Sequence, residues 1–377
     1  MIYLDNAATS FPKPYCVVNA VREAFLQYGA NPGRGGYQMS LDTAERIFRV
    51  RENFAKTFHS GSPERVVFTQ NCTHALNLAL KCFLPKGAHI VVSDREHNSV
   101  MRPLEAMAAE GLITYSVAEI GRDVVNTAAY FARKINQNTA ALLCVHTSNV
   151  DGQVMPVAEL GRLAAKFGML FIVDAAQAAG SAVIDMAADG IDLLCMPGHK
   201  GLFGPSGSGV LLIRDHAPLR TLIEGGTGSD SMLKKQPLNL PEALESGTQA
   251  VNAIIGLGEG LRFVNELGAG NIGEHERQLR EVLVERTEGL SGLRIYEPTK
   301  ASGIYLFNFD GMCCERTASE LENEGIAVRA GLHCAPSAHE VLGTLPDGAV
   351  RISFGIFNDC EQVERTASAL WKISKAV

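Results

Sequence analysis

The chain has 377 residues, of which 46% are hydrophobic and 20% charged, a balance typical of a globular enzyme rather than a disordered chain. This length favours two domains. The net charge of -7 offers no basic surface for nucleic acid, and no apolar run approaches the roughly 20 residues that span a bilayer. The chain starts MIYLDN, without the basic and then apolar pattern of a secretory signal, so we expect a cytoplasmic protein.

Nine cysteines are scattered along the chain without a CxxC pair. We therefore expect neither a zinc site nor a disulfide framework, and no metal. Taken singly, each cysteine is a small hydrophobic residue of the core unless its context says otherwise. They are Cys16, Cys72, Cys82, Cys144, Cys195, Cys313, Cys314, Cys334 and Cys360.

From about residue 65, short apolar runs typical of buried strands alternate with amphipathic stretches. The alternation predicts an α/β fold with a mostly parallel sheet. The predicted strands lie at 66–68, 90–92, 141–145 and 170–173. One predicted helix face consists of Val157, Leu160, Leu163, Ala164 and Phe167, spaced by three and four residues.

The carboxy-terminal third has a different pattern, which predicts a separate α+β domain. A helical stretch near 248–290 precedes four runs that resemble strands, and a last helix turns Val363, Leu370 and Ile373 inward. The four runs are 293–296, 304–309, 326–329 and 350–354. We predict a large domain over residues 15–250 and a small domain formed by residues 1–14 and 251–377.

Polar residues follow the apolar runs, where open α/β sheets bind ligands. Among them, Lys200 lies between Gly198 and Gly201. A lysine that forms an imine with an aldehyde cofactor needs such a mobile, glycine-flanked loop, because its amine must move away when the substrate replaces it. Asp174 can keep a pyridine nitrogen protonated, Gln177 can donate to the phenolic oxygen and His97 can stack on the ring. The set predicts a pyridoxal 5'-phosphate (PLP) enzyme.

A phosphate would suit the start of the helix near Thr73, because a helix start presents unpaired N–H groups and a positive dipole end. Taken alone, Thr73 would be a helix cap.

Gly256, Gly258 and Gly260 resemble a dinucleotide fingerprint, but no strand precedes them and a helical pattern runs through them. The sequence contains no P-loop.

Seven segments together resemble the cysteine desulfurases and selenocysteine lyases, which are class V, fold-type I PLP enzymes related to aminotransferases. The match covers nearly the whole chain, although other class V enzymes share some of the motifs. The segments are YLDNAATSFPKP (3–14), QNCTHALNLAL (70–80), EHNSVMRPL (96–104), HTSNVDGQVMPV (146–157), VDAAQAAG (173–180), GHKGLFGPSGSGVL (198–211) and RAGLHCAP (329–336).

The resemblance implies a role for each matching position. Thr248 would reach the phosphate of the other subunit's cofactor, which implies a homodimer with shared sites. Relatives often carry serine or threonine where this chain has Pro197, so one phosphate hydrogen bond must come from elsewhere. The implied cofactor-binding residues are Lys200, Asp174, Gln177, His97, Cys72, Thr73, His199 and Thr248, and Lys200, Cys334 and His97 would be catalytic.

Arg351, Asn149 and Ala7 match substrate-binding positions. The planar guanidinium of Arg351 suits a carboxylate better than a lysine would. The alternative is that Arg351 is a surface charge at a strand edge.

Cys334 is the residue that distinguishes a desulfurase from other enzymes of this class. Its neighbours form a loop, which predicts an exposed thiol, and Arg329 and His333 could lower its pKa. The short loop resembles the branch that relies on an acceptor protein, whereas the Cys313–Cys314 pair is interpreted as incidental.

The predicted reaction converts L-cysteine to L-alanine and leaves a persulfide on Cys334, which passes to an acceptor in iron-sulfur cluster, thiolated cofactor or selenium metabolism. Three alternatives stay open. A selenocysteine lyase would use the same pocket, a class V aminotransferase would leave Cys334 idle, and a scaffold without turnover would lack the lysine or the aspartate.

Overall fold

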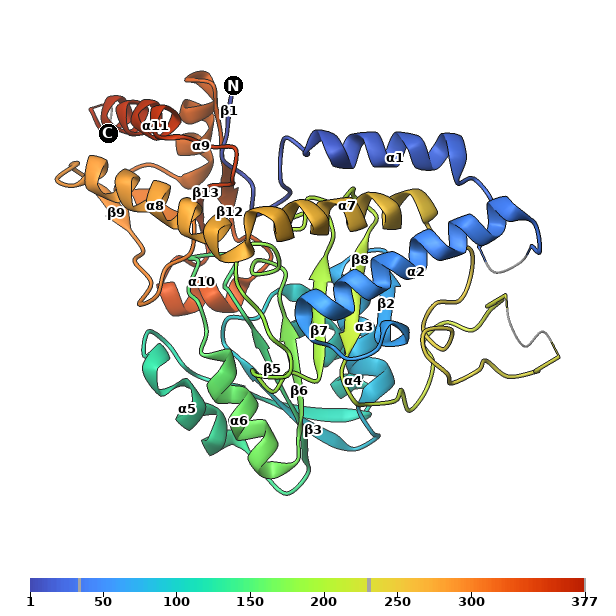
Figure 1. The fold of residues 1–377 in the computed structure, drawn as a ribbon. Coiled ribbons are helices and arrows are strands. Elements are labelled where there is room, and N and C mark those ends of the chain that lie inside the picture. Colours follow the sequence, from blue (N-terminus) through green and yellow to red (C-terminus); the bar gives the residue numbers. More distant parts are fainter. Residues whose placement is uncertain (33–34, 229–231, 376–377) are drawn as a thin grey trace.

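A computed structural model describes residues 1–32, 35–228 and 232–375. Its largest sheet has seven strands in the order β2-β8-β7-β6-β5-β3-β4 (Figure 1). β8 is antiparallel to both neighbours and the other pairs are parallel, which confirms the predicted mostly parallel sheet. The strands are β2 (Val66–Thr69), β3 (Ala88–Ser93), β4 (Ile113–Ala118), β5 (Thr139–Val145), β6 (Leu170–Asp174), β7 (Leu193–Pro197) and β8 (Gly209–Ile213).

Helices cover both faces of this sheet, and the period of two along each strand assigns side chains to them. In β5, Leu142 and Cys144 pack into one core, whereas Ala141 and Leu143 pack into the other. α3 (Cys72–Phe83) and α4 (Asn98–Ala109) cover one face. The other face is covered by α2 (Gln38–Phe58), α5 (Thr127–Lys134), α6 (Val157–Phe167) and α7 (Val251–Leu267).

Two helix predictions change in detail. α6 buries Val157, Leu160 and Ala164, but Phe167 at its last turn is 53% exposed, so its predicted place on the buried face is wrong. The stretch predicted near 248–290 is two helices, α7 and α8 (Ala269–Thr287), because Gly268 lies between them with φ 83°, outside the helical region. The three glycines of the rejected fingerprint lie inside α7.

The carboxy-terminal region holds a four-stranded antiparallel sheet in the order β12-β13-β10-β9. Its strands are β9 (Leu293–Ile295), β10 (Ile304–Phe309), β12 (Arg329–Gly331) and β13 (Ala349–Ser353). Around it lie α8, α9 (Cys314–Asn323), α10 (Pro336–Leu342) and α11 (Cys360–Ser374). α11 buries Val363, Leu370 and Ile373, as predicted.

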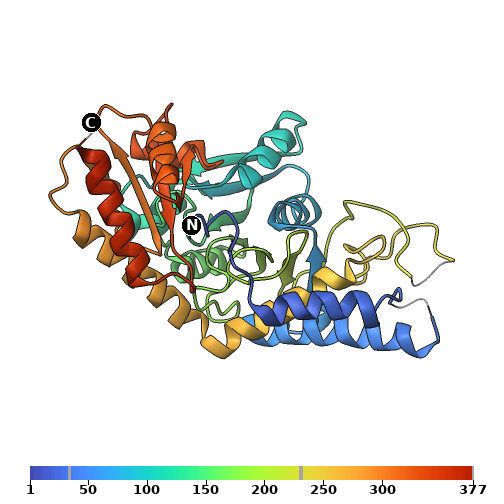
Figure 2. The ribbon, with the colours of Figure 1, turned by 90° about the horizontal axis from the view of Figure 1, so that it is seen from above.

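The amino terminus joins this region. β1 (Ile2–Tyr3) pairs in parallel with β11 (Ile326–Ala327), and the chain then crosses to α1 (Tyr15–Gln27). Figure 2 shows α1 along one edge of the molecule, where α7 packs against both α1 and α2. Two 3-10 turns, Pro63–Arg65 and Val124–Asn126, complete the elements, and no helix in the described ranges is both long and apolar enough to cross a membrane.

Candidate active site

Asp174 is the last residue of β6, where an apolar strand ends in a carboxylate. It is 2% exposed, and its Oδ1 accepts hydrogen bonds from the Ala176 N–H at 2.9 Å and the Cys72 thiol at 3.5 Å. Burial and the neighbouring Asp174 raise the pKa of the Cys72 thiol well above its usual value, so this thiol stays protonated. Asp174 therefore has fixed donors beside it and a defined orientation.

Lys200 lies in the loop after β7. A side chain at Gly201 would come within 2.4 Å of the Ala179 carbonyl oxygen, so the chain needs glycine next to this lysine. Burial lowers the pKa of Lys200, and the charge of Asp174 acts against that shift. The loop thus favours a neutral, nucleophilic amine close to a carboxylate.

The amino-terminal segment holds the neighbouring residue in place. The His199 carbonyl accepts hydrogen bonds from Lys13 Nζ at 2.6 Å and Thr9 Oγ1 at 3.0 Å. Burial, followed by the charges of Lys200 and Lys13, lowers the pKa of His199 to about 4. Lys13 has its own pKa lowered to about 8 by burial, and we had assigned it no role from the sequence.

His97 precedes α4 and acts as its N-cap, because its Nδ1 accepts from the Ser99 N–H at 3.0 Å. Burial lowers the pKa of His97, while the nearby Asp174 acts in the opposite direction. A neutral ring with Nδ1 occupied is fixed in one orientation, which suits a stacking residue.

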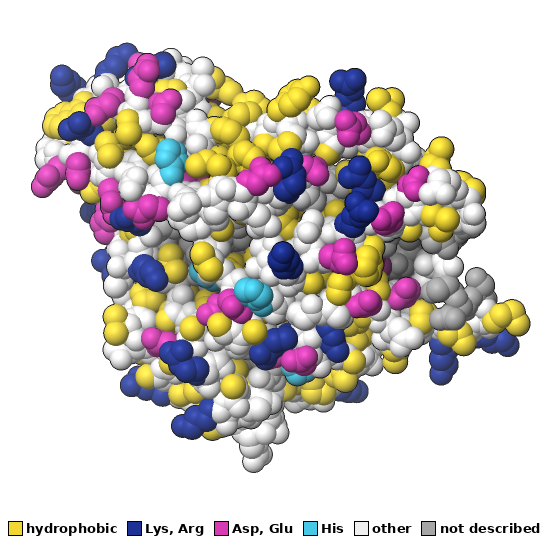
Figure 3. Space-filling model, viewed as in Figure 1, with side chains coloured by type: hydrophobic (Ala, Val, Ile, Leu, Met, Phe, Trp, Pro, Cys, Tyr) yellow, Lys and Arg dark blue, Asp and Glu magenta, His cyan; other side chains and the backbone are white. Residues whose placement is uncertain are grey.

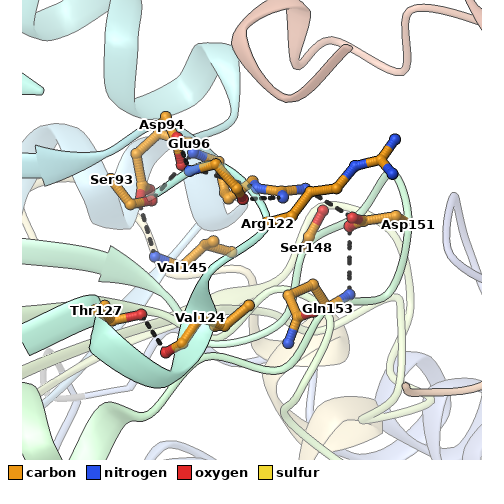
Figure 4. Close-up of polar contacts among 12 residues, drawn as sticks. Ser93, Asp94, Glu96, Arg122, Val124, Thr127, Val145, Ser148, Asp151 and Gln153 are labelled. Carbon is orange, nitrogen blue, oxygen red and sulfur yellow. Dashed lines mark hydrogen bonds and ion pairs between the residues drawn. The ribbon is translucent and has the colours of Figure 1, made fainter. Parts of the chain in front are cut away.

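Glu96 was missed by the sequence interpretation, although a carboxylate directly before His97 at the end of a buried strand was a signal. The residue is fully buried, and its Oε1 accepts from the Val145 N–H at 2.9 Å and from the Ser93 hydroxyl (Figure 4). Burial raises its pKa to about 8. Glu96 therefore joins the ends of β3 and β5 beside His97.

Gln177, which follows β6 of the large sheet, forms a hydrogen bond with Ala7 of the amino-terminal segment. The Gln177 Nε2 donates to the Ala7 carbonyl at 3.0 Å, and the Ala7 N–H donates to Ser353 Oγ at 2.9 Å. Both residues line a cavity of about 50 Å³ together with Lys200. The structure thus brings the predicted Ala7, Gln177 and Lys200 together.

The start of α3 has unpaired donors, although Thr73 is not its cap. The cap is Asn71, whose Oδ1 accepts from the His74 N–H at 2.9 Å. Within the described ranges, the N–H groups of Cys72 and Thr73 have no protein acceptor. Such a helix start suits a phosphate.

Thr248 lines a different cavity from the one that Lys200 lines. It is exposed and lines a cavity of about 150 Å³ with Gln70 and His74 at the start of α3. Pro197 ends β7, where it offers no N–H.

Arg351 is buried in β13, an inner strand, so the alternative of a charge at a strand edge is wrong. Its Nη1 donates to the Asn149 carbonyl at 2.8 Å and its Nη2 donates to Asp5 Oδ1 at 2.8 Å. Its Nε is buried without a partner in the described part of the chain. The partner Asp5 was not foreseen, and the unused Nε leaves Arg351 able to bind a further anion.

Cys334 is exposed, as predicted, and the backbone of its loop contacts the segments that follow β3 and β5. Its carbonyl accepts from the Asn98 N–H at 2.8 Å, and the preceding His333 carbonyl accepts from Asn149 Nδ2 at 2.8 Å. Burial lowers the pKa of His333 to about 2. The expectation that His333 contributes positive charge to the thiol is therefore wrong, because its ring is neutral.

These residues fit pyridoxal phosphate. The lysine amine and carboxylate are buried close together, and unpaired N–H groups at a helix start suit the phosphate. All nine cysteines are free thiols, and no cluster of three or more potential metal ligands occurs in the ranges that the structure describes.

Comparison with known proteins identifies the class. The aminotransferase class-V family matches residues 2–366, and the chain belongs to this family. This confirms the predicted family and, with the sheet described above, the predicted fold class.

Within the family, the curated relatives are named cysteine desulfurases. The probable cysteine desulfurase of Pyrococcus abyssi is 34% identical over 100% of this chain and 95% of its own, and that of Halalkalibacterium halodurans is 31% identical over 99% and 93%. The apo cysteine desulfurase of Thermococcus onnurineus superposes with a TM-score of 0.92 at 32% identity, covering 100% of this chain and 95% of its own. The cysteine desulfurase CsdA of Escherichia coli gives a TM-score of 0.88 at 26% identity over 100% and 95%.

Proposed function

We propose that this chain is a PLP-dependent cysteine desulfurase, which converts L-cysteine to L-alanine and takes the sulfur onto Cys334 as a persulfide. One observation carries the proposal. The carbonyl of the exposed Cys334 accepts from the N–H of Asn98. The loop of this thiol therefore lies next to His97, whose ring is close enough to Asp174 and Lys200 for their charges to act on its pKa. An aminotransferase has no need of a thiol at this position.

The chain's residues would bind the cofactor and orient the substrate. PLP, when bound, supplies an electron sink for the substrate carbon, and Lys200, Asp174, Gln177 and His97 would hold it. The unpaired N–H groups at Cys72 and Thr73, with His199, are proposed for its phosphate.

Arg351 and Asn149 are proposed to bind the substrate carboxylate, and Ala7 borders the same cavity as Lys200. Arg351 has an unused buried Nε, and Asn149 stands between Arg351 and the Cys334 loop. The amine of Lys200, whose pKa is lowered by burial, would remove the proton from the substrate Cα.

In the sulfur transfer, the Cys334 thiolate attacks the substrate sulfur. The carbon–sulfur bond breaks, a sulfur–sulfur bond forms, and the carbon keeps the electron pair and takes up a proton to become the methyl group of alanine. No external oxidant is consumed, because the carbon is reduced as the sulfur is oxidised.

The persulfide is proposed to pass to an acceptor protein, which would serve iron-sulfur cluster, thiolated cofactor or selenium metabolism in the cytoplasm. Cys334 is exposed and held on a short loop, so an acceptor must approach it. The division into domains 15–250 and 1–14 plus 251–377 stays a prediction.

A homodimer is also proposed, with Thr248 contributing to the partner's site. Hydrophobic side chains gather along the top edge of the molecule over α1 (Figure 3), where Phe25 is 69% and Leu26 72% exposed. A second copy would cover this apolar face. Sedimentation of the loaded protein should give twice the chain mass, and a monomer would refute the shared site.

The function is tested by replacing Cys334 with alanine, and Cys360→Ala is the matched control at another exposed thiol. Alanine production from L-cysteine should fall at least about a hundredfold in Cys334→Ala. The cofactor absorbance and its change on adding L-cysteine should persist, since those depend on Lys200.

Retained desulfuration by Cys334→Ala would refute the role of that thiol. The same assay with L-selenocysteine distinguishes the lyase alternative, because selenium departs more readily and need not be accepted by Cys334.

A further inference from the structure

The backbone at Cys334 is held in an unusual conformation. His333 has φ 49° and Cys334 has φ 56°, and both lie in the left-handed region that residues other than glycine seldom occupy. Two such residues in succession are maintained only where surrounding contacts hold them. The loop therefore requires contacts that hold it in this conformation.

A chain of side-chain hydrogen bonds supplies such contacts. His333 Nδ1 and His339 Nε2 are 3.1 Å apart, and His339 Nδ1 lies 2.7 Å from Thr344 Oγ1. At the other end, His333 Nε2 lies 3.4 Å from the Arg329 carbonyl oxygen. The two rings stack at 5.3 Å, and both residues are buried, His339 completely.

The proton positions in this chain follow from its ends. The Arg329 carbonyl can only accept, so His333 Nε2 carries a proton and His333 Nδ1 accepts from His339 Nε2. His339 Nδ1 then accepts from the Thr344 hydroxyl at 2.7 Å, which is closer than that hydroxyl's other acceptor, the His339 carbonyl oxygen at 3.2 Å. Every group is satisfied in this one arrangement, so both rings are fixed in tautomer and orientation.

The His333–His339 pair does not hold the Cys334 loop through electric charge. Burial lowers the pKa of His333 to about 2 and that of His339 to about 4, so both rings are neutral at ordinary pH. The same segment already contributes Ala335, Ala338 and Leu342 to an apolar cluster. The specific hydrogen bonds are what two histidines add at this place.

We propose that the His333–His339 pair, anchored on Thr344, is a positioning device that fixes the backbone of Cys334 for attack on the substrate sulfur. The proposal rests on the proposed function for its catalytic consequence. Asn149 also holds the His333 carbonyl, but it is proposed to bind the substrate carboxylate as well. The histidine pair keeps the loop in place when that amide turns to the substrate.

Two substitutions at His339 separate hydrogen bonding from packing. A glutamine amide can reach the place of the imidazole Nε2, whereas an asparagine amide reaches only that of Nδ1. His339→Gln therefore keeps the contact with His333 and loses that with Thr344, whereas His339→Asn loses the contact with His333 and can keep that with Thr344. Thr344→Val, which is isosteric, is a second variant that removes the anchor should His339→Asn fail to fold.

The first measurement is amide hydrogen exchange of residues 329–335 in protein without cofactor. Exchange should accelerate about three- to tenfold in His339→Asn, the effect of one lost hydrogen bond, and stay within about twofold of wild type in His339→Gln. Thr344→Val should move in the same direction as His339→Asn but by no more than about twofold, because His339→Gln loses the same contact with Thr344.

The second measurement is steady-state desulfuration by the loaded enzyme. In His339→Asn, kcat should fall about three- to tenfold while KM for L-cysteine changes less than about twofold, and His339→Gln should restore kcat. Equal effects of the two variants would reduce the pair to packing and overturn the proposal. Faster exchange in His339→Asn with unchanged kcat would also overturn it.

A wild-type enzyme that forms no persulfide at Cys334 would refute the proposed function instead. The exchange data would still show whether the pair holds the loop, because they need neither cofactor nor turnover.

Discussion

At the carboxyl edge of the seven-stranded sheet, Asp174 is buried and Lys200 is half-buried a few residues after its strand, whereas Cys334 is exposed and lies on a loop beyond the short edge strand β12. Asp174 and Lys200 are positioned by the sheet itself. Cys334 is positioned by side chains from other elements, with Asn149 and His333 184 residues apart in the chain. One region is therefore specified by topology and the other by long-range contacts.

Replacing Lys200 should give the largest effect and should separate the two regions. Lys200→Ala removes both the cofactor attachment and the proposed base, so alanine production should fall at least about a thousandfold. Hydrogen exchange of residues 329–335 should not change, because no contact of the Cys334 loop uses the lysine. Turnover assays and mass spectrometry measure both.

The control is Lys86→Ala, an exposed lysine, which should retain full activity. Reduction with borohydride should label position 200 in wild type and in the control. Residual activity above about 1% in Lys200→Ala would contradict the assignment.

Asp174→Asn tests the same buried region with an isosteric change. Without the negative charge, the proton on the cofactor ring is no longer stabilised, and kcat should fall about a hundredfold or more. The pKa of Lys200 should fall further, since the charge of Asp174 is the largest influence that opposes the effect of burial. In protein freed of cofactor, the pH dependence of the absorbance change on adding pyridoxal phosphate reports this shift, because only the neutral amine forms the imine.

Asp215→Asn, at a carboxylate that is 82% exposed, should change neither kcat nor the absorbance profile. An unchanged kcat in Asp174→Asn would remove that residue from the site.

The contrast between the regions explains what the sequence could predict. Asp174, His97 and Lys200 follow apolar runs, and parallel strands end at one edge, so their meeting followed from the pattern. The exposure of Cys334 followed from its polar, glycine-containing surroundings. These predictions needed only local sequence and a general rule of sheet topology.

Other features depend on partners that local patterns do not reveal. Asp5 pairs with Arg351 because β13 lies beside the amino-terminal segment, and nothing near Asp5 indicates that. His333 was predicted to be a charged neighbour of the thiol, but burial against His339 makes it neutral. Burial depends on the tertiary fold, which short segments do not specify.

Asp5→Asn tests the side of the site where the two regions join. The carboxylate holds Nη2 of Arg351 at 2.8 Å, and a neutral amide would hold it less firmly. KM for L-cysteine should rise about fivefold while kcat changes less than about twofold. Asp310→Asn, at a residue that is 70% exposed, is the control for steady-state kinetics.

A fall in kcat without a rise in KM would contradict the role of Asp5. It would mean that Arg351 acts on the reacting atoms rather than on binding.

Glu96→Gln should give the smallest effect, and the effect should be on stability. Burial raises the pKa of Glu96 to about 8 from the usual 4.5, so between these pH values the folded chain holds a proton that the unfolded chain has lost. Native stability is therefore reduced progressively as the pH rises through this window. Glutamine resembles the protonated acid and removes this penalty.

Melting temperatures of Glu96→Gln and wild type should agree at pH 4.5 and diverge toward pH 8.5, where the variant should be about 1–3 °C more stable. The exposed Glu52→Gln should show no such divergence. A variant less stable than wild type at pH 8.5 would mean that Glu96 is ionised and supports the ends of β3 and β5 as a carboxylate. His97 would then stand beside a buried negative charge, and its neutral state would need another explanation.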